Sequence, residues 1–140
     1  MTTFYISPSS LSYKQYASIY SAAISFGWSA PWSWGRESFR PDYVIEGHML
    51  SKAMVGISRS DIFIAVIPGT CSTLVEIGMA YTLCEKLFIV SKDPVHFTQT
   101  GLCDAHLSAL PGLSRVCCGI EDIPEMLLKE YLYLVDVASL

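Results

Sequence analysis

Apolar runs alternate with polar turns along the whole chain. Continuous apolar runs are typical of strands buried on both faces, and apolar positions at helical spacing are typical of amphipathic helices. The continuous and β-prone runs predict five strands, at residues 4–7, within 29–41, and at 62–67, 87–90 and 115–118. The helical spacing predicts helices at residues 12–26, 43–58 and 74–83, and another from residue 123 onward.

This order of elements predicts one α/β domain over residues 1–140. Crossovers between parallel strands are right-handed, and they place helices on both faces of the sheet. The chain contains no internal repeat or low-complexity tract that would divide it. We therefore expect a Rossmann-like (flavodoxin-like) fold with a parallel five-stranded sheet.

The composition excludes several classes of function. With 51% hydrophobic residues, 16% charged residues and a mean hydropathy of +0.39, the chain is too apolar to be disordered. Its formal charge of -4 has the wrong sign for gripping duplex nucleic acid. The apolar runs are far shorter than the about 20 residues of a membrane helix, and the N-terminus lacks a signal-peptide pattern. We expect a cytoplasmic protein that binds neither duplex nucleic acid nor a membrane.

Cysteine and histidine spacing gives no sign of a metal centre. The five cysteines are unevenly spaced, without the paired spacing of a zinc site, and are expected to be free thiols. The three histidines also lack ligand spacing. We expect no metal and no cofactor.

The loops after the strands are the candidate site. Ligands of open parallel sheets bind beyond the carboxyl ends of the strands, which here are the loops at residues 7–12, 32–40 and 68–76. The third loop is rich in small polar residues at the start of a helix, an arrangement suited to an oxyanion. Its candidate binding residues are Gly69, Thr70, Ser72 and Thr73.

Glu76 lies one turn into the helix that follows this loop. A carboxylate that faces the crevice at this position can act as a nucleophile or stabilise a cationic centre. The alternative is that Glu76 completes a capping box with Ser72 or Thr73.

The central segment SRSDIFIAVIPGTCSTLVEIGMAYTLCEKLFIV resembles the nucleoside 2-deoxyribosyltransferases and the related 2'-deoxynucleoside 5'-monophosphate N-glycosidases. The shared pattern is an Asp before an apolar strand, a small-residue loop, Glu-hydrophobic-Gly-x-Ala and a second apolar strand. The N-terminal FYISPSS extends the resemblance over most of the chain. The resemblance implies cleavage of an N-glycosidic bond by hydrolysis or transfer, with Glu76 as the nucleophile and Tyr5 as a second catalytic residue. It also implies that Ser72 and Thr70 bind a 5'-phosphate.

Other polar and aromatic residues of these loops are expected to contact the nucleoside or nucleotide. Ser7 follows the first strand and is a candidate binding residue. The aromatic residues that could stack on the base are Tyr5, Trp32, Trp34 and Phe39. The arginines that could meet the phosphate are Arg36 and Arg40.

One position departs from the family pattern. The family places an Asp eight residues before the Asp that opens the third strand, where it positions or protonates the base. Counting back from Asp61, this chain has Ala53 at that place. Another residue then assists the leaving base, with Glu46 and His48 as candidates on the same segment, or turnover is lost.

Two other functions remain open. The first is a TIR-like domain that cleaves NAD, because such domains also place a Glu on the helix after an apolar strand. The second is a non-catalytic nucleotide-binding sensor, for which Ala53 is the motivating residue.

The apolar surface predicts self-association. The chain has few charges for its length, an apolar helix at residues 74–83 and the C-terminal segment LYLVDVASL. The resembled family forms homodimers or larger homo-oligomers in which a neighbour's C-terminal segment closes the active site. The tail after Tyr131 is therefore expected to complete the pocket of a second subunit.

Overall fold

A computed structural model describes residues 1–39, 47–99 and 103–140 of the chain. In these residues the sheet consists of four parallel strands in the order β1-β2-β3-β4. Their bounds are β1 (Phe4–Ile6), β2 (Ile62–Val66), β3 (Lys86–Ser91) and β4 (Ser114–Cys117). The parallel α/β class predicted from the sequence is confirmed.

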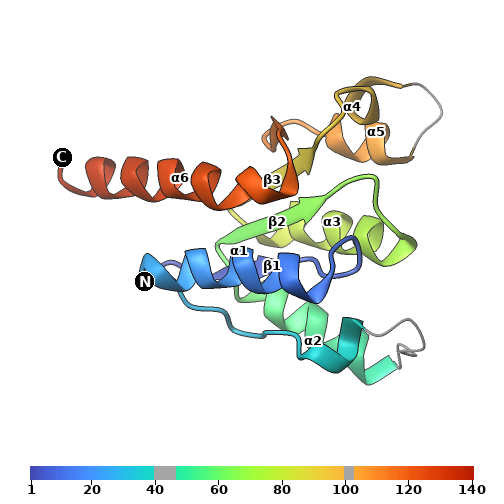
Figure 1. The fold of residues 1–140 in the computed structure, drawn as a ribbon, viewed down its shortest axis with the longest axis horizontal. Helices are drawn as coiled ribbons and strands as arrows, with labels where there is room; N and C mark the ends of the chain where they lie inside the picture. The colour runs from blue at the N-terminus through green and yellow to red at the C-terminus, as the bar shows by residue number, and fades with distance from the viewer. Residues whose placement is uncertain (40–46, 100–102) are drawn as a thin grey trace.

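Helices cover both faces of this sheet (Figure 1). The helices α1 (Tyr13–Ser25) and α6 (Ile123–Ala138) pack together on one face. The other face is covered by α2 (Gly47–Ser58) and α3 (Cys71–Leu83). Four shorter elements complete the described chain: η1 (Arg36–Phe39), α4 (Val95–Thr98), α5 (Cys103–Ser108) and η2 (Ile120–Asp122).

The continuous apolar character of β2 follows from this layering. Its alternate residues Ile62, Ile64 and Val66 pack into the core beneath α1 and α6. Phe63 and Ala65 point the opposite way, into the core beneath α2 and α3. Because both faces are dry, neither set of positions can be polar.

The described part of residues 29–41 does not form the predicted strand, so this prediction is wrong and the sheet of the described residues has four strands, not five. The chain after α1 pairs with the sheet edge only through an isolated bridge between Thr3 and Ser29. Phe4 N donates to Ser29 O at 3.0 Å, and Ser29 N donates to Thr2 O at 3.0 Å. Pro31 has no N–H to continue such a ladder, and the chain leaves the edge instead.

Two further features differ from the sequence prediction, and one predicted boundary is not tested. The helix α3 begins at Cys71, with Thr70 rather than Ser72 or Thr73 as its N-cap, because Thr70 Oγ1 accepts from Thr73 N at 3.4 Å. The predicted start of α2 at residue 43 lies outside the described residues. The short helices α4 and α5 were not predicted, because few apolar positions recur at helical spacing in so short a segment. Among the described residues, no helix has the length and apolar character needed to cross a membrane.

Candidate active site

The site is built around Glu76, which lies on α3 just beyond the carboxyl end of β2. Its side chain is buried, with 5% of the residue exposed. The hydroxyl of Tyr5 donates a hydrogen bond to Oε1 of Glu76, and Ser7 Oγ donates to Oε2 at 2.9 Å. Each carboxylate oxygen therefore has its own hydroxyl donor, and the group is held in one orientation.

Strand β1 brings these two donors to Glu76. Tyr5 and Ser7 are two residues apart, so both side chains point to the same face of the sheet. Tyr5 pairs in register with Phe63 of β2, and their rings stack at 5.9 Å. Ser7 N donates to Ile64 O at 2.9 Å, which fixes the chain just past the end of the strand.

Trp34 determines the direction of the Tyr5 hydroxyl proton. The indole Nε1 of Trp34 donates to the Tyr5 oxygen at 3.1 Å. A phenol has a single proton, so a hydroxyl that accepts from Trp34 uses that proton toward Glu76. Trp34 is itself anchored, because its backbone N donates to the hydroxyl of Tyr16 at 3.0 Å. The relay Trp34–Tyr5–Glu76 thus runs in one direction.

Trp32 lies beside this relay, with its ring edge-to-face against Trp34 at 5.8 Å. Its indole N–H is buried and has no hydrogen-bond acceptor among the described residues. The ammonium of Lys52 lies 4.8 Å from the centre of the Trp32 ring, a cation–π contact. A buried donor without a partner is unusual in a folded protein.

Burial dominates the electrostatics of the cluster. It raises the pKa of Glu76 to about 7, although the hydrogen bonds from Tyr5 and Ser7 act in the opposite direction. Burial and the neighbouring Glu76 raise the pKa of Tyr5 above its ordinary value. Tyr5 is therefore a hydrogen-bond donor at neutral pH and a poor source of a proton. Burial also raises the pKa of Tyr16, to about 12.

The small-residue loop is tied to the loop after β1 by hydroxyl groups. Thr73 Oγ1 lies 2.8 Å from Ser9 Oγ and 3.0 Å from Ser10 Oγ, and Thr70 Oγ1 donates to Ser9 Oγ at 2.9 Å. A Cβ on Gly69 would lie 2.7 Å from the Cβ of Thr73, so the close approach of this loop to α3 requires glycine.

The capping-box interpretation of Glu76 is wrong, because both of its oxygens bind Tyr5 and Ser7. Ser72 is partly exposed, and no hydrogen bond of its hydroxyl occurs among the described residues. It is the loop hydroxyl that remains available to a ligand.

Ala53, the residue at the place of the family's Asp, lies on α2 close to the Glu76 cluster. Ala53 is 3% exposed and packs in the core beneath α2 and α3. The next turn of α2 approaches the cluster closely, since a Cβ on Gly56 would lie 2.9 Å from Trp32 Cβ and 3.1 Å from Tyr5 Cδ2.

Phe39 and Arg36 do not join the Glu76 cluster. Phe39 packs on Tyr13 and Tyr16, and the Arg36 guanidinium lies over the Tyr13 ring at 4.7 Å. Both side chains therefore lie against α1, on the face of the sheet opposite to α2 and α3. Arg40, Glu46 and the side chain of His48 lie outside what the structure describes.

The sequence interpretation missed the contributions of Tyr16, Ser9 and Ser10. Each acts through a loop contact that periodicity does not encode. The polar SPSS run after β1 was the available signal for the two serines. No group of three or more His, Cys, Asp or Glu side chains that could hold a metal ion occurs in the described part of the chain.

A comparison with solved structures finds the CMP N-glycosidase BcmB of Clostridium botulinum. The two chains share 13% sequence identity with a TM-score of 0.61, over 92% of this chain and 99% of that one. At this identity the similarity shows a shared fold alone. A scan against protein-family models and a search of curated proteins both give no match.

Proposed function

We propose that the protein cleaves the N-glycosidic bond of a nucleoside or a nucleoside 5'-monophosphate, with Glu76 as the nucleophile. The observation that carries this proposal is the buried Glu76 carboxylate, hydrogen-bonded at both oxygens, at the carboxyl edge of a parallel sheet. The fold shared with a CMP N-glycosidase supports the same class of reaction.

The chemistry of the bond explains why a buried carboxylate suits this reaction. When the bond between C1' and the base nitrogen breaks, its electron pair leaves with the base and positive charge develops at C1'. An ionised Glu76 stabilises that charge and forms a bond to C1' through one oxygen. Attack by water then releases the sugar, whereas attack by a second base gives transfer.

Tyr5 and Ser7 act as positioning residues for this carboxylate. Their hydroxyls hold it in one orientation, and the Trp34 indole holds the Tyr5 hydroxyl. A fixed nucleophile needs little reorganisation to reach C1'. The rings of Trp32 and Trp34 flank the cluster and supply the apolar surface against which a base packs.

In the resembled family an Asp eight residues before the position of Asp61 assists the departing base, and this chain lacks that Asp. Ala53 occupies that place, and the described part of α2 carries no acidic residue. The Tyr5 hydroxyl is not a substitute, because its raised pKa makes it a poor proton donor. We infer that the substrate has a base that leaves readily or that receives its proton from water.

The absence of an acid from the described part of α2 also favours a second function, a nucleotide-binding sensor without turnover. A sensor would keep the Glu76 cluster and bind nucleotide without releasing base. NAD cleavage of the TIR-like kind would instead release nicotinamide. These outcomes separate the three functions in one assay.

The assay incubates the wild-type protein with nucleosides, nucleoside 5'-monophosphates including CMP, and NAD, and separates free base by chromatography. We expect free base from a nucleoside or a monophosphate. Binding without base release in any reaction would favour the sensor, and free nicotinamide would favour the NAD-cleaving domain.

A further inference from the structure

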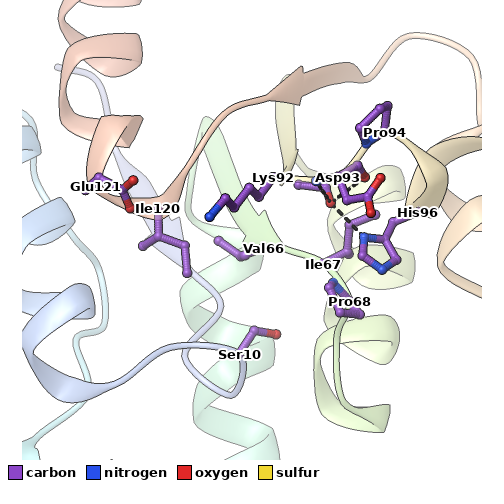
Figure 2. A pocket seen from close by; sticks show the side chains of 11 residues that line it. Ser10, Val66, Ile67, Pro68, Lys92, Asp93, Pro94, His96, Ile120 and Glu121 are labelled. Atoms are coloured by element: carbon purple, nitrogen blue, oxygen red, sulfur yellow. Dashed lines mark hydrogen bonds between the residues drawn. The ribbon is translucent and has the colours of Figure 1, made fainter.

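A cavity apart from the Glu76 cluster lies at the carboxyl edge of the sheet (Figure 2). Its volume is about 740 Å³, within the range of small-molecule sites. Its walls come from the loops that follow β1, β2, β3 and β4, and neither Glu76, Tyr5 nor Trp34 lines it. The catalytic proposal therefore leaves this cavity without a role.

One wall of the cavity is apolar. The exposed Pro68 and the partly buried Ile120 supply its accessible surface. Val66 and Ile67, which also line it where β2 ends, are largely buried, with 7% and 2% of each residue exposed (Figure 2). A ring can pack against such a surface, because the wall offers apolar area without a competing hydrogen-bonding side chain.

A cation lies at this wall. Lys92 follows β3, and Figure 2 shows its side chain extending across the cavity near Val66. Its ammonium forms no ion pair among the described residues, where Lys86 instead pairs with Glu130 at 3.8 Å. An ammonium without a carboxylate partner at the wall of a cavity is suited to an anionic group, and lysine is a common phosphate ligand.

The polar side chains of Glu121 and His96 lie on opposite sides of the cavity (Figure 2). His96 Nδ1 lies 2.9 Å from Ser91 Oγ, so its other ring nitrogen is the one left for a ligand. The Glu121 carboxylate accepts hydrogen bonds and suits a ligand hydroxyl. Asp93 also lines the cavity, but its Oδ1 accepts from Val95 N at 3.0 Å.

We propose that this cavity is a second binding site, for a phosphomonoester carried on a hydroxylated ring, such as a sugar phosphate or a nucleotide. Lys92 pairs with the phosphate, the apolar wall packs on the ring, and Glu121 and His96 bind ring hydroxyls. The site adjoins the catalytic cluster, because Ser10 lines the cavity and also hydrogen-bonds Thr73 at 3.0 Å.

The test is calorimetric titration of the full chain with ribose 5-phosphate, with ribose and inorganic phosphate as reference ligands. None of the three contains an N-glycosidic bond, so binding is measured without turnover. Lys92→Met keeps the length of the side chain and removes its charge, and the matched control is Lys129→Met on the exposed surface of α6. CMP titrated into Glu76→Gln protein and into Glu76→Gln with Lys92→Met shows whether a nucleotide also binds through Lys92, apart from its binding at the catalytic site.

We expect ribose 5-phosphate to bind at least about tenfold more tightly than ribose, and Lys92→Met to weaken it about 10- to 100-fold. Lys129→Met should bind as the wild type does. Equal affinity in Lys92→Met and wild type, or no saturable binding to wild type, would overturn the proposal.

The KM for the nucleotide substrate separates this site from the catalytic one. We expect Lys92→Met to leave that KM unchanged. A KM raised by the same factor as the dissociation constant would make the cavity part of the catalytic site and would also overturn the proposal. Failure of the proposed function would instead appear as a lack of base release by wild type, with the titration unaffected.

Discussion

Ser7 Oγ donates a 2.9 Å hydrogen bond to Oε2 of Glu76 across 69 residues of sequence. The other oxygen, Oε1, accepts from Tyr5, so a side chain of β1 and one just after it hold the carboxylate of α3. All three groups are buried, with Ser7 0% and Tyr5 1% exposed. Unlike an exposed glutamate, this carboxylate has a fixed orientation and a raised pKa.

Tyr5→Phe removes the donor to Oε1 of Glu76 and leaves the Trp34 indole N–H without its acceptor. We expect a loss of about 1–3 kcal/mol in the free energy of unfolding, because buried polar groups lose their partner. The pKa of Glu76 should rise further, since the bond from Tyr5 lowers it. Chemical denaturation and the pH dependence of base release measure the two effects.

The matched control for Tyr5→Phe is Tyr20→Phe, which removes the same atom from the opposite face of the sheet. It should leave the pH dependence of base release unchanged. An unchanged pH profile in Tyr5→Phe as well would contradict the role assigned to the Tyr5 hydroxyl.

The raised pKa of Glu76 also makes stability depend on pH. Its pKa is about 7 in the folded chain against 4.5 in the reference state, so the folded chain binds the proton more tightly. The stabilisation from the protonated carboxyl is complete below pH 4.5 and is lost as pH rises through 7. The shift corresponds to about 3 kcal/mol.

Glu76→Gln removes the pH-dependent contribution of Glu76 to the unfolding free energy, because glutamine stays neutral at every pH. Relative to this variant, the wild type should lose about 3 kcal/mol of unfolding free energy between about pH 4.5 and pH 8. Urea denaturation of both proteins across this range measures the difference. A difference independent of pH would mean that Glu76 titrates at its ordinary value.

The rate of base release should rise with pH, whereas the stability of the folded chain falls. A carboxylate nucleophile must be ionised, so kcat/KM should rise as pH increases through about 7. A profile already flat at about pH 5 would show that the reacting group is not a buried glutamate with a raised pKa.

Ser72 is the position from which to test a 5'-phosphate contact. If its hydroxyl binds the phosphate at the start of α3, monophosphates should be cleaved faster than nucleosides, and Ser72→Ala should remove the difference. The loss of one charge-assisted hydrogen bond corresponds to about 10- to 100-fold in kcat/KM for the monophosphate. Ser58→Ala, at the far end of α2, is the control. Equal rates on both substrate types in wild type would argue for the transferase branch.

Sequence patterns could predict the elements that carry Tyr5, Ser7 and Glu76, whereas the catalytic roles of Tyr5 and Glu76 came from the family resemblance and stay predictions. A tyrosine on a strand, a serine at its end and a glutamate one turn into a helix are placed by strand and helix geometry alone. The contact of Trp34 with Tyr5 depends on the path of an irregular loop, and no periodicity encodes such a path.

The same limit explains the missing fifth strand. Aromatic residues after α1 favour a strand by propensity, but Pro31 lacks the N–H that a further ladder bond requires, and pairing ends at the Ser29 bridge. The cap of α3 was misplaced by two to three residues because Thr70, Ser72 and Thr73 all have the chemistry of an N-cap.

The C-terminal helix tests the expected homodimer. An apolar stripe on α6 is exposed at the spacing of one helix face: Leu128 42%, Leu132 56% and Val135 49%. A second copy of the chain would cover such a surface. Leu132→Glu with Val135→Glu should give a monomer with an unchanged fold, measured by light scattering and circular dichroism. Wild-type protein of about 15 kDa at working concentration, fully active, would refute self-association.

The most direct test of Glu76 as the nucleophile compares base release by wild type and Glu76→Gln on the same panel of nucleosides and monophosphates. Calorimetry of both proteins shows whether the variant remains folded. We expect free base with wild type and a loss of roughly 10³-fold or more with folded Glu76→Gln, because the amide can neither bond to C1' nor offset its charge. Base release by folded Glu76→Gln at the wild-type rate would contradict the assignment of Glu76 as the nucleophile.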